Sequence, residues 1–518
     1  MLPSESHTLS RRDLLKLGAG TAVLAATGMR PAHAAANGAG RPHILFIMAD
    51  QFRGDCVGAD GNKAIRTPNL DRIAHEGVRF SCAYSSTPTC TPARAALLSG
   101  LSPWRHGMLG YGKVAEKYPV EMPQALRDAG YYTMGIGKMH WHPQRNPHGF
   151  HKVLLDEAAQ AHTPEFRSDY ISWFMSEAPN LQYDVTGVDW NSFETKAYAL
   201  PERLHPTHWT GETAVKFIDS YEQAEPFFLK VSFHRPHSPY DPPERFMKMY
   251  EDAELPPAAV GDWAQRYAPR SDNGRNIWHG DLGAEQVRRS RQGYYGSVSF
   301  VDEEIGRILA SLERRGWLDN TLVVFTADHG DMTGDHHLWR KSYAYEASAR
   351  IPMLMRWPAG LIDAERGQVR DHPVELRDVL PTLLAAAGTH AEGLDGQSML
   401  EPVANPACEW RPWIDLEHDI CYDPSNHWNA LTDGKWKYVF HARTGEEQLF
   451  HLQTDPHERT DLARDANAAH TLQTWRQRLV EHLRERGEAF VKDGVLVPRP
   501  ERMLYSPNYP GEIPAKKK

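Results

Sequence analysis

Short apolar runs alternate along the chain with segments of helical periodicity. Five runs are rich in β-branched, aromatic and long aliphatic residues and predict buried strands: 43–48, 131–136, 227–233, 322–326 and 351–355. Three segments have a helical pattern that a glycine closes: 69–76, 123–129 and 295–315. Glycine after the last periodic residue is typical of a helix end. This alternation predicts an α/β fold, in which helices flank a large, mostly parallel sheet.

The pattern changes after residue 405. Segments 436–440 and 448–452 flank a turn that contains Gly445, which predicts an antiparallel hairpin, and a helix is expected over 470–486. We therefore expect a catalytic α/β domain at 41–405 and a smaller C-terminal α+β domain at 406–518. Residues 151–220 lack clear periodicity and are expected to form loops.

The first residues resemble an export signal. The run Ser10-Arg11-Arg12-Asp13-Leu14-Leu15-Lys16 resembles the twin-arginine motif, an apolar segment follows it, and Ala32-His33-Ala34 has the small residues that a signal peptidase needs. Residues 1–34 are thus expected to be a signal peptide that the twin-arginine export machinery recognises, with the mature protein periplasmic or secreted. After residue 35, no run is long and apolar enough to span a bilayer, so we expect no stable membrane anchor.

The composition of the chain limits the kinds of partner and metal site to expect. The chain has 518 residues, of which 41% are hydrophobic and 24% charged, values typical of globular proteins. Its formal net charge of −9 argues against nucleic acid as a partner. It has an odd number of cysteines, five, which needs an explanation in an exported protein. Cys408 and Cys421 either pair or stay free thiols, and the absence of Cys-x-x-Cys spacing argues against a structural zinc site.

Polar residues follow four of the predicted strands directly. They are Asp50 and Gln51, Lys138 and His140, His234 and His237, and Asp328 and His329. Ligands of open α/β sheets bind outside the carboxyl ends of the strands, so we expect these side chains to converge on one crevice.

Four of these residues form a candidate metal site. Asp50, Gln51, Asp328 and His329 offer carboxylate, carboxamide and imidazole donors. Such a set suits one divalent metal ion, with Ca²⁺ expected first and Mn²⁺ or Mg²⁺ as alternatives.

The run Cys90-Thr91-Pro92-Ala93-Arg94 stands just before a short apolar helix. If Cys90 opens that helix, Arg94 lies one turn further and beside it, where its guanidinium is expected to hold an anion or the modified side chain. The run resembles the signature of the formylglycine-dependent sulfatases, members of the alkaline phosphatase-like superfamily related to choline sulfatases and phosphonate monoester hydrolases. The resemblance extends over about 41–462.

Two further elements carry the same resemblance. Gly137-Lys138-Met139-His140 resembles the family's Gly-Lys-x-His element, and His234-Arg235-Pro236-His237 resembles its His-x-Pro-His element. The chain departs from the family at Gln51, where the family usually has a second aspartate.

The resemblance implies a mechanism. A maturation enzyme oxidises Cys90 to formylglycine, and the hydrate of that aldehyde, held by the metal, attacks the sulfur of a sulfate ester while Asp328 accepts its proton. His237 protonates the departing alcohol, with His234 as a neighbour that could take this role, and inorganic sulfate is released. The implied catalytic residues are Cys90, Arg94, Lys138, His140, His237 and Lys341. The implied metal ligands are Asp50, Gln51, Cys90, Asp328 and His329.

Two alternatives stay open. A phosphonate monoester hydrolase or phosphodiesterase would use the same formylglycine on a similar tetrahedral anion. A pseudoenzyme would bind sulfated glycans without cleaving them. For a sulfatase, the leaving alcohol is expected to be a sulfated carbohydrate first and a small aryl or alkyl alcohol next.

Overall fold

The computed structural model describes residues 40–157, 166–271, 277–419, 421–423 and 426–513. The expected signal peptide, residues 1–34, lies outside the described residues. All five cysteines lie within them and are free, so Cys408 and Cys421 do not pair in this structure. No helix in the described ranges is both long and apolar enough to cross a membrane.

One mixed, mostly parallel sheet forms the centre of the fold, as predicted. Its strand order is β5-β4-β6-β1-β7-β8-β2-β9. The strands are β5 (Lys152–Leu155), β4 (Tyr132–Gly137), β6 (Phe227–Pro236), β1 (His43–Asp50), β7 (Thr321–Ala327), β8 (Met353–Arg356), β2 (Val78–Phe80) and β9 (Gln368–Arg370). The five from β5 to β7 pair in parallel, and β8 pairs antiparallel with both β7 and β2.

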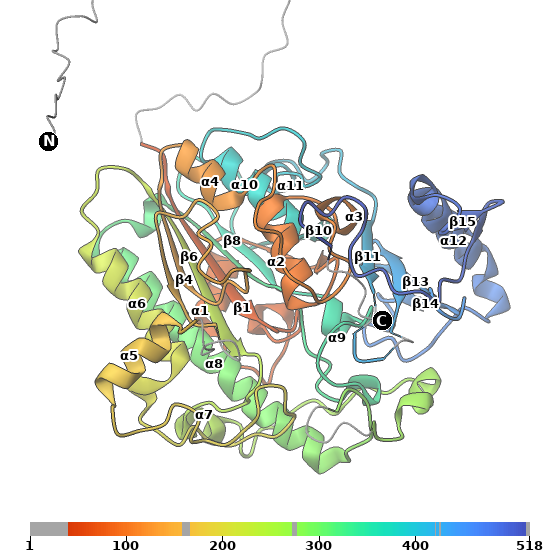
Figure 1. Ribbon diagram of the computed structural model, residues 1–518, viewed down its shortest axis with the longest axis horizontal. Helices are drawn as coiled ribbons and strands as arrows, with labels where there is room; N and C mark the ends of the chain where they lie inside the picture. The colour runs from red at the N-terminus through yellow and green to blue at the C-terminus, as the bar shows by residue number, and fades with distance from the viewer. Residues whose placement is uncertain (1–39, 158–165, 272–276, 420, 424–425, 514–518) are drawn as a thin grey trace, which may run out of the picture. The chain divides into compact units, whose positions relative to one another are not determined.

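Helices cover both faces of this sheet (Figure 1). One layer contains α1 (Pro68–His75), α6 (Pro206–Ser220) and α8 (Ala284–Arg314), and the other contains α2 (Cys90–Ser99), α4 (Met122–Asp128) and α10 (Val379–Ala386). Shorter helices lie in the connections: α3 (Pro103–His106), α5 (Asp169–Glu177), α7 (Glu244–Met249), α9 (Glu346–Ala349) and α11 (Leu400–Ala404). Because both faces are covered, the strand residues are buried on both sides, which explains their continuous apolar runs.

The C-terminal part forms a second, antiparallel sheet. It contains β11 (Ile414–His418), β12 (Trp428–Thr432), β13 (Trp436–His441) and β14 (Glu447–His451), and α12 (Ala469–Leu483) packs on it. The predicted hairpin and helix are confirmed, as β13–β14 and α12. The domain boundary near residue 405 stays a prediction. Two short pairs complete the described strands: β3 (Ala83–Tyr84) with β10 (Val374–Glu375), and β15 (Val491–Lys492) with β16 (Val495–Leu496).

Two expectations about local structure were wrong. Helix α8 begins at Ala284, well before residue 295. The sequence pattern missed its first turns because they bury polar groups such as Arg291, which pairs with Asp335 at 2.7 Å. Such partners remove the apolar periodicity that marks a helix. The stretch 151–220 contains β5, α5 and α6 as well as loops. Glycine and threonine dilute the buried face of α6, so its periodicity is weak.

A buried ion pair between the two sheets generates a stability prediction. The Lys437 ammonium on β13 is fully buried and lies 2.7 Å from Glu346 Oε1 and 2.8 Å from Glu458 Oε1. Lys437→Met would leave Glu458 without its cation and Glu346 with Arg350 alone, so we expect it to lower the free energy of unfolding by about 3 kcal/mol. Urea denaturation measures this. The exposed neighbour Lys435 is the control, and Lys435→Met should change stability by less than about 0.5 kcal/mol. Equal losses of stability in the two variants would contradict the prediction.

Candidate active site

The register of the central strands brings the site together. Ala49 on β1 is paired with both Phe233 on β6 and Ala327 on β7. Asp50 and Asp328 each come one residue later, so their carboxylates meet at the carboxyl edge of the sheet. A shift of register between Ala49 and Asp50 places Asp50 opposite the end of β6, just before His237.

Strand β4 ends in a glycine for a steric reason. Gly137 has φ +94°, and a Cβ there would lie 2.1 Å from the carbonyl oxygen of Ser232. Only glycine allows the chain to pass β6 this closely and turn. Lys138 follows directly, and its ammonium lies 2.6 Å from Asp50 Oδ2.

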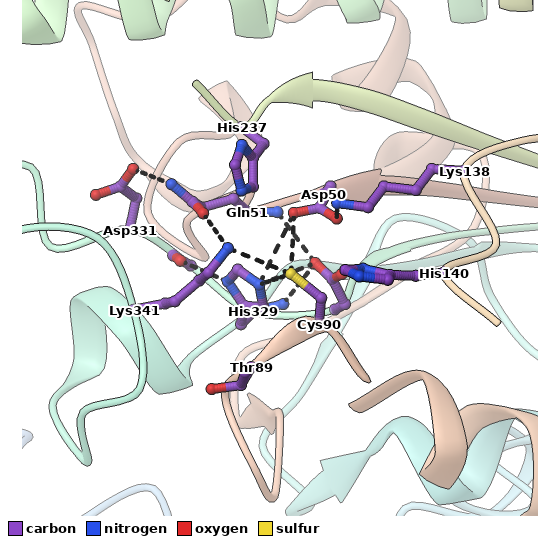
Figure 2. A network of polar contacts seen from close by, with 12 residues as sticks. Asp50, Gln51, Thr89, Cys90, Lys138, His140, His237, His329, Asp331 and Lys341 are labelled. Atoms are coloured by element: carbon purple, nitrogen blue, oxygen red, sulfur yellow. Dashed lines mark hydrogen bonds and ion pairs between the residues drawn. The ribbon is translucent and has the colours of Figure 1, made fainter. Parts of the chain in front are cut away.

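Cys90 is the first residue of α2 and is 1% exposed, so Arg94 does lie one turn further along this helix. The preceding residue, Thr89, is held by two side chains, because its Oγ1 lies 2.6 Å from Ser342 Oγ and 2.8 Å from His418 Nε2. The Cys90 sulfur lies 3.1 Å from His329 Nε2 and 3.2 Å from Lys341 Nζ. The Cys90 side chain, which we expect to be oxidised to formylglycine, is thus fixed among the polar residues of the site (Figure 2).

Four donor atoms face one another here. Asp50, Cys90, Asp328 and His329 each offer one atom, and these atoms lie within 4.8 Å of one another. The outer oxygen of each carboxylate is already bound, since Asp50 Oδ2 accepts from Lys138 and Arg94 and Asp328 Oδ2 accepts from Arg94. The two inner oxygens therefore face the centre of the cluster.

His329 presents a lone pair to this centre. Its Nδ1 lies 2.9 Å from the carbonyl oxygen of Gly330, so Nδ1 carries the hydrogen and Nε2 does not in the neutral ring. Nε2 lies 3.8 Å from Asp50 Oδ1 and 3.7 Å from Asp328 Oδ1. Burial alone would lower the pKa of His329, yet the negative charges of Asp328 and Cys90 raise it. The same negative charges would attract a cation to the centre of the cluster. These residues therefore fit a divalent metal ion.

Arg94 contacts different groups from those the sequence suggested. We predicted that its guanidinium would hold an anion or the modified side chain. In the structure, it donates to Asp328 Oδ2 at 2.9 Å, to Asp50 Oδ2 at 3.0 Å and to the Lys138 carbonyl oxygen at 2.6 Å. Burial works against the charge, but the two carboxylates keep Arg94 protonated by raising its pKa. Arg94 therefore orients the carboxylates.

Gln51 is held in one amide orientation. Its Nε2 donates to Asp331 Oδ2 at 2.5 Å, while its Oε1 accepts from Lys341 Nζ at 2.9 Å. Its φ of +66° is left-handed, which is uncommon outside glycine, and its backbone N–H and C=O bond Asp328 and Tyr294. The carboxamide oxygen thus points away from Asp331 and toward Lys341.

The cations around Cys90 favour its anionic form. Burial and the Asp50 carboxylate would raise the pKa of the Cys90 thiol, but Lys341, Lys138 and His329 hold that pKa well below its ordinary value. The two lysines are themselves almost fully buried. This surplus of buried positive charge suits an anionic substrate group.

His234 on β6 and His237, which directly follows that strand, differ in tautomer. His237 Nδ1 lies 2.7 Å from the Ser238 carbonyl oxygen and so carries a hydrogen, which leaves Nε2 able to gain or lose a proton. His234 Nδ1 instead accepts from the Arg235 guanidinium, so neutral His234 carries its hydrogen on Nε2. Burial lowers the pKa of both rings far below normal, and Arg235 adds to this effect on His234 and Lys341 on His237. Both rings are therefore neutral here. The open Nε2 of His237 can take up a proton and pass it on, whereas neutral His234 can only donate a hydrogen bond through its Nε2 hydrogen.

His140 lies beside the Cys90 side chain (Figure 2). Its backbone N–H donates to Glu157 Oε1 at 3.0 Å, and its Nε2 lies 3.3 Å from the Tyr111 hydroxyl. Burial and Lys138 lower the pKa of His140, so the ring is neutral. A neutral imidazole in this place can accept a proton from the group at position 90.

Sequence reasoning missed several residues that support the site. They are Thr89, Tyr111, Glu157, Asp331, Ser342 and His418. Asp331 stands three residues after Asp328 in Asp-His-Gly-Asp, which was a usable signal. The others lie in segments where nothing in the local pattern marks them.

Fold and site together define a hydrolase for esters of tetrahedral anions. The carboxyl edge of an α/β sheet carries a candidate metal centre, a buried side chain at a helix N-terminus and cations that suit an anionic group.

Comparison with known proteins identifies the family. Residues 42–389 match the sulfatase family model, and residues 334–485 match the model described as N-sulphoglucosamine sulphohydrolase, C-terminal. The chain is 37% identical to an arylsulfatase of Clostridium perfringens, over 88% of this chain and 97% of that protein. It is 33% identical to a choline-sulfatase of Rhizobium meliloti, over 82% of this chain and 83% of that protein.

A solved structure with a similar fold is the phosphonate monoester hydrolase of Agrobacterium radiobacter. The TM-score is 0.71 at 25% identity, and the match covers 89% of this chain and 100% of that one. The chain belongs to the sulfatase family and is a sulfuric ester hydrolase. The alternative of a phosphonate monoester hydrolase is not favoured.

The Asp331 contact generates a prediction about metal affinity. Asp331→Asn would let the Gln51 amide turn over, because asparagine can accept as well as donate. With Ca²⁺ as the probe ion and Gln51 as the expected ligand, binding should weaken about 10- to 100-fold, the range typical of residues that orient metal ligands. Thermal unfolding at a series of Ca²⁺ concentrations measures this affinity.

Tyr240→Phe is the control for that variant. It removes a hydrogen bond of 2.5 Å to the same Asp331 oxygen but keeps the carboxylate. It should therefore retain most of the affinity. The prediction fails if Tyr240→Phe weakens Ca²⁺ binding as much as Asp331→Asn does.

Proposed function

We propose that this sulfatase cleaves its ester with formylglycine at position 90. The observation that carries the proposal is the place of the Cys90 sulfur, which meets the metal-ligand cluster on one side and Lys341 on the other. A side chain at position 90 would contact both a metal ion in this cluster and the sulfate group of an ester that Lys341 neutralises.

The proposed metal is Ca²⁺, held by Asp50, Gln51, Asp328, His329 and residue 90. The donor set is mainly oxygen, which suits this ion. When bound, the ion would supply positive charge that stabilises a deprotonated hydroxyl of the hydrate and a sulfate oxygen. Arg94 and Lys138 hold the two aspartates in place for it.

The reaction then follows from the residues around position 90. One hydroxyl of the hydrate loses its proton to Asp328 and attacks sulfur, and the bond from sulfur to the alcohol oxygen breaks. With the anionic ester bound, His237 carries a proton on Nε2 and gives it to that oxygen, while Lys138 and Lys341 neutralise the sulfate oxygens.

Release of sulfate uses the second hydroxyl. Neutral His140 accepts its proton, the carbonyl of the aldehyde re-forms, and the bond from carbon to the sulfate oxygen breaks. Water then rehydrates the aldehyde. A serine or threonine lacks this second hydroxyl and could not release sulfate in this way, which is the advantage of a geminal diol.

Maturation and export form part of the proposal. A formylglycine-generating enzyme would convert Cys90, and the twin-arginine machinery would export the folded protein to the periplasm or beyond. The Cys90–Arg94 run supports the first step, and the Arg11-Arg12 motif supports the second. The twin-arginine route carries folded proteins, so conversion in the cytoplasm can precede it.

The first prediction concerns residue 90 itself. The tryptic peptide of residues 80–94, from protein made in its native host, should have the mass expected for formylglycine at position 90. Cys90→Ala, and protein that keeps the thiol, should lose at least about 10³-fold in kcat/KM for a sulfate ester. Mass spectrometry and sulfate release measure the two outcomes. An active enzyme with an unmodified thiol would refute the mechanism.

The second prediction concerns the general acid. His237→Asn should lower kcat/KM about 10²-fold or more for an alkyl sulfate, whose alkoxide needs a proton to leave. It should have a much smaller effect on 4-nitrophenyl sulfate, whose leaving group is stable without one. His234→Asn is the matched control, and it should affect both substrates equally because His234 only donates a hydrogen bond. The reverse pattern would make His234 the acid.

A further inference from the structure

Three histidines of the site each leave one ring nitrogen open to a ligand. His140 Nδ1, His234 Nε2 and His237 Nε2 are buried, and none has a hydrogen-bond partner among the residues that the structure describes. Several other buried histidines also have an unpaired nitrogen, but these three lie around Cys90, where a bound ester can pair with them. The rings of His140 and His237 also mark two borders of the site around Cys90 (Figure 2).

An aromatic side chain lies against each of these two rings. The Trp190 ring stacks on His237, with centroids 5.6 Å apart and planes 7° apart. The Tyr111 ring meets His140 edge to face, with centroids 5.8 Å apart. Both aromatic residues come from segments without helix or strand, remote from each other in sequence.

The two aromatic rings are partly exposed, whereas the histidines that they contact are buried. Trp190 is 37% exposed and Tyr111 39%, whereas His237 and His140 beneath them are 0% and 8% exposed. The sulfate end of an ester must reach the buried groups, so its alcohol has to extend outward past the exposed rings. An exposed tryptophan that packs on a catalytic histidine is suited to contact that alcohol.

Both rings are also fixed in place. The carbonyl oxygen of Trp190 accepts a hydrogen bond of 2.6 Å from Ser238 Oγ, the residue after His237. The Tyr111 hydroxyl lies 3.3 Å from His140 Nε2. Preorganised rings lose little freedom when they bind a flat group.

We propose that Trp190 and Tyr111 form the leaving-group site of this enzyme and select sulfate esters of aromatic alcohols. The proposal rests on the proposed function and names its substrate class. It takes aryl esters ahead of the carbohydrate esters that the sequence suggested first, because the exposed rings over the two histidines offer flat apolar surface on which an aromatic alcohol can stack.

The experiment compares two substrates in two pairs of variants. Trp190→Leu and Tyr111→Leu remove each ring, while Trp190→Phe and Tyr111→Phe keep one. We expect each leucine variant to lose about tenfold in kcat/KM for 4-nitrophenyl sulfate, the upper range of one aromatic contact, and at most about threefold for hexyl sulfate. The phenylalanine variants keep a ring, so the ratio of their kcat/KM values for the two substrates should stay within about threefold of the wild-type ratio.

The direction of the selectivity change separates stacking from damage to the acid. A disturbed His237 would slow hexyl sulfate more than 4-nitrophenyl sulfate, because the alkoxide needs the proton. Loss of a stacking contact slows the aryl ester more. A larger loss on hexyl sulfate, or equal losses in the leucine and phenylalanine variants, would overturn the proposal.

A binding measurement keeps the two proposals apart. Calorimetry on Cys90→Ala needs no formylglycine, and 4-nitrophenyl sulfate should bind it more weakly by about tenfold once Trp190→Leu is added. If that difference holds while Cys90 proves unmodified in the active wild type, the formylglycine mechanism fails and the leaving-group site stands. If binding is insensitive to Trp190, the leaving-group site fails whatever the nucleophile.

Discussion

The site depends on the buried guanidinium of Arg94 between two buried carboxylates. Arg94, Asp50 and Asp328 all have side chains with no exposed surface, so removal of any one would leave an uncompensated charge in the interior. Arg94 stands one turn after Cys90 on α2. The same ion pairs that neutralise the ends of β1 and β7 therefore also fix the helix that begins at Cys90. The position of Cys90, the proposed nucleophile, and the charge of the two candidate metal ligands are coupled through a single side chain.

The C-terminal sheet takes part in this arrangement from the other side. His418, the last residue of β11, binds Thr89, and the backbone N–H of Glu417 donates to the Ser86 carbonyl oxygen at 2.8 Å. Trp428 on β12 donates to the carbonyl oxygen of Ser342, the residue after Lys341. The second sheet thus holds both the loop before Cys90 and the loop that carries Lys341. Its role in the site is to hold these two loops in position relative to each other.

The sequence predicted the central sheet and most of the site for one physical reason. Buried parallel strands need continuous apolar runs, and residues that follow such runs meet at the carboxyl edge. This placed Asp50, Lys138, His237 and Asp328 together without knowledge of strand order. The partners of buried polar groups were not readable, because they depend on tertiary contacts. The redirected Arg94 and the early start of α8 both follow from such partners.

The charges of the site explain how one arrangement can serve different esters. Lys138, Lys341 and Arg94 surround residue 90 together with Asp50 and Asp328, and neutral Gln51 adds no negative charge where the family usually has an aspartate. These cations favour the single negative charge of a sulfate ester and are indifferent to the alcohol attached to it. Selection among alcohols must then come from side chains beyond the charged groups. The exposed rings of Trp190 and Tyr111, each packed on a buried histidine, lie where recognition can vary without disturbing the chemistry beneath.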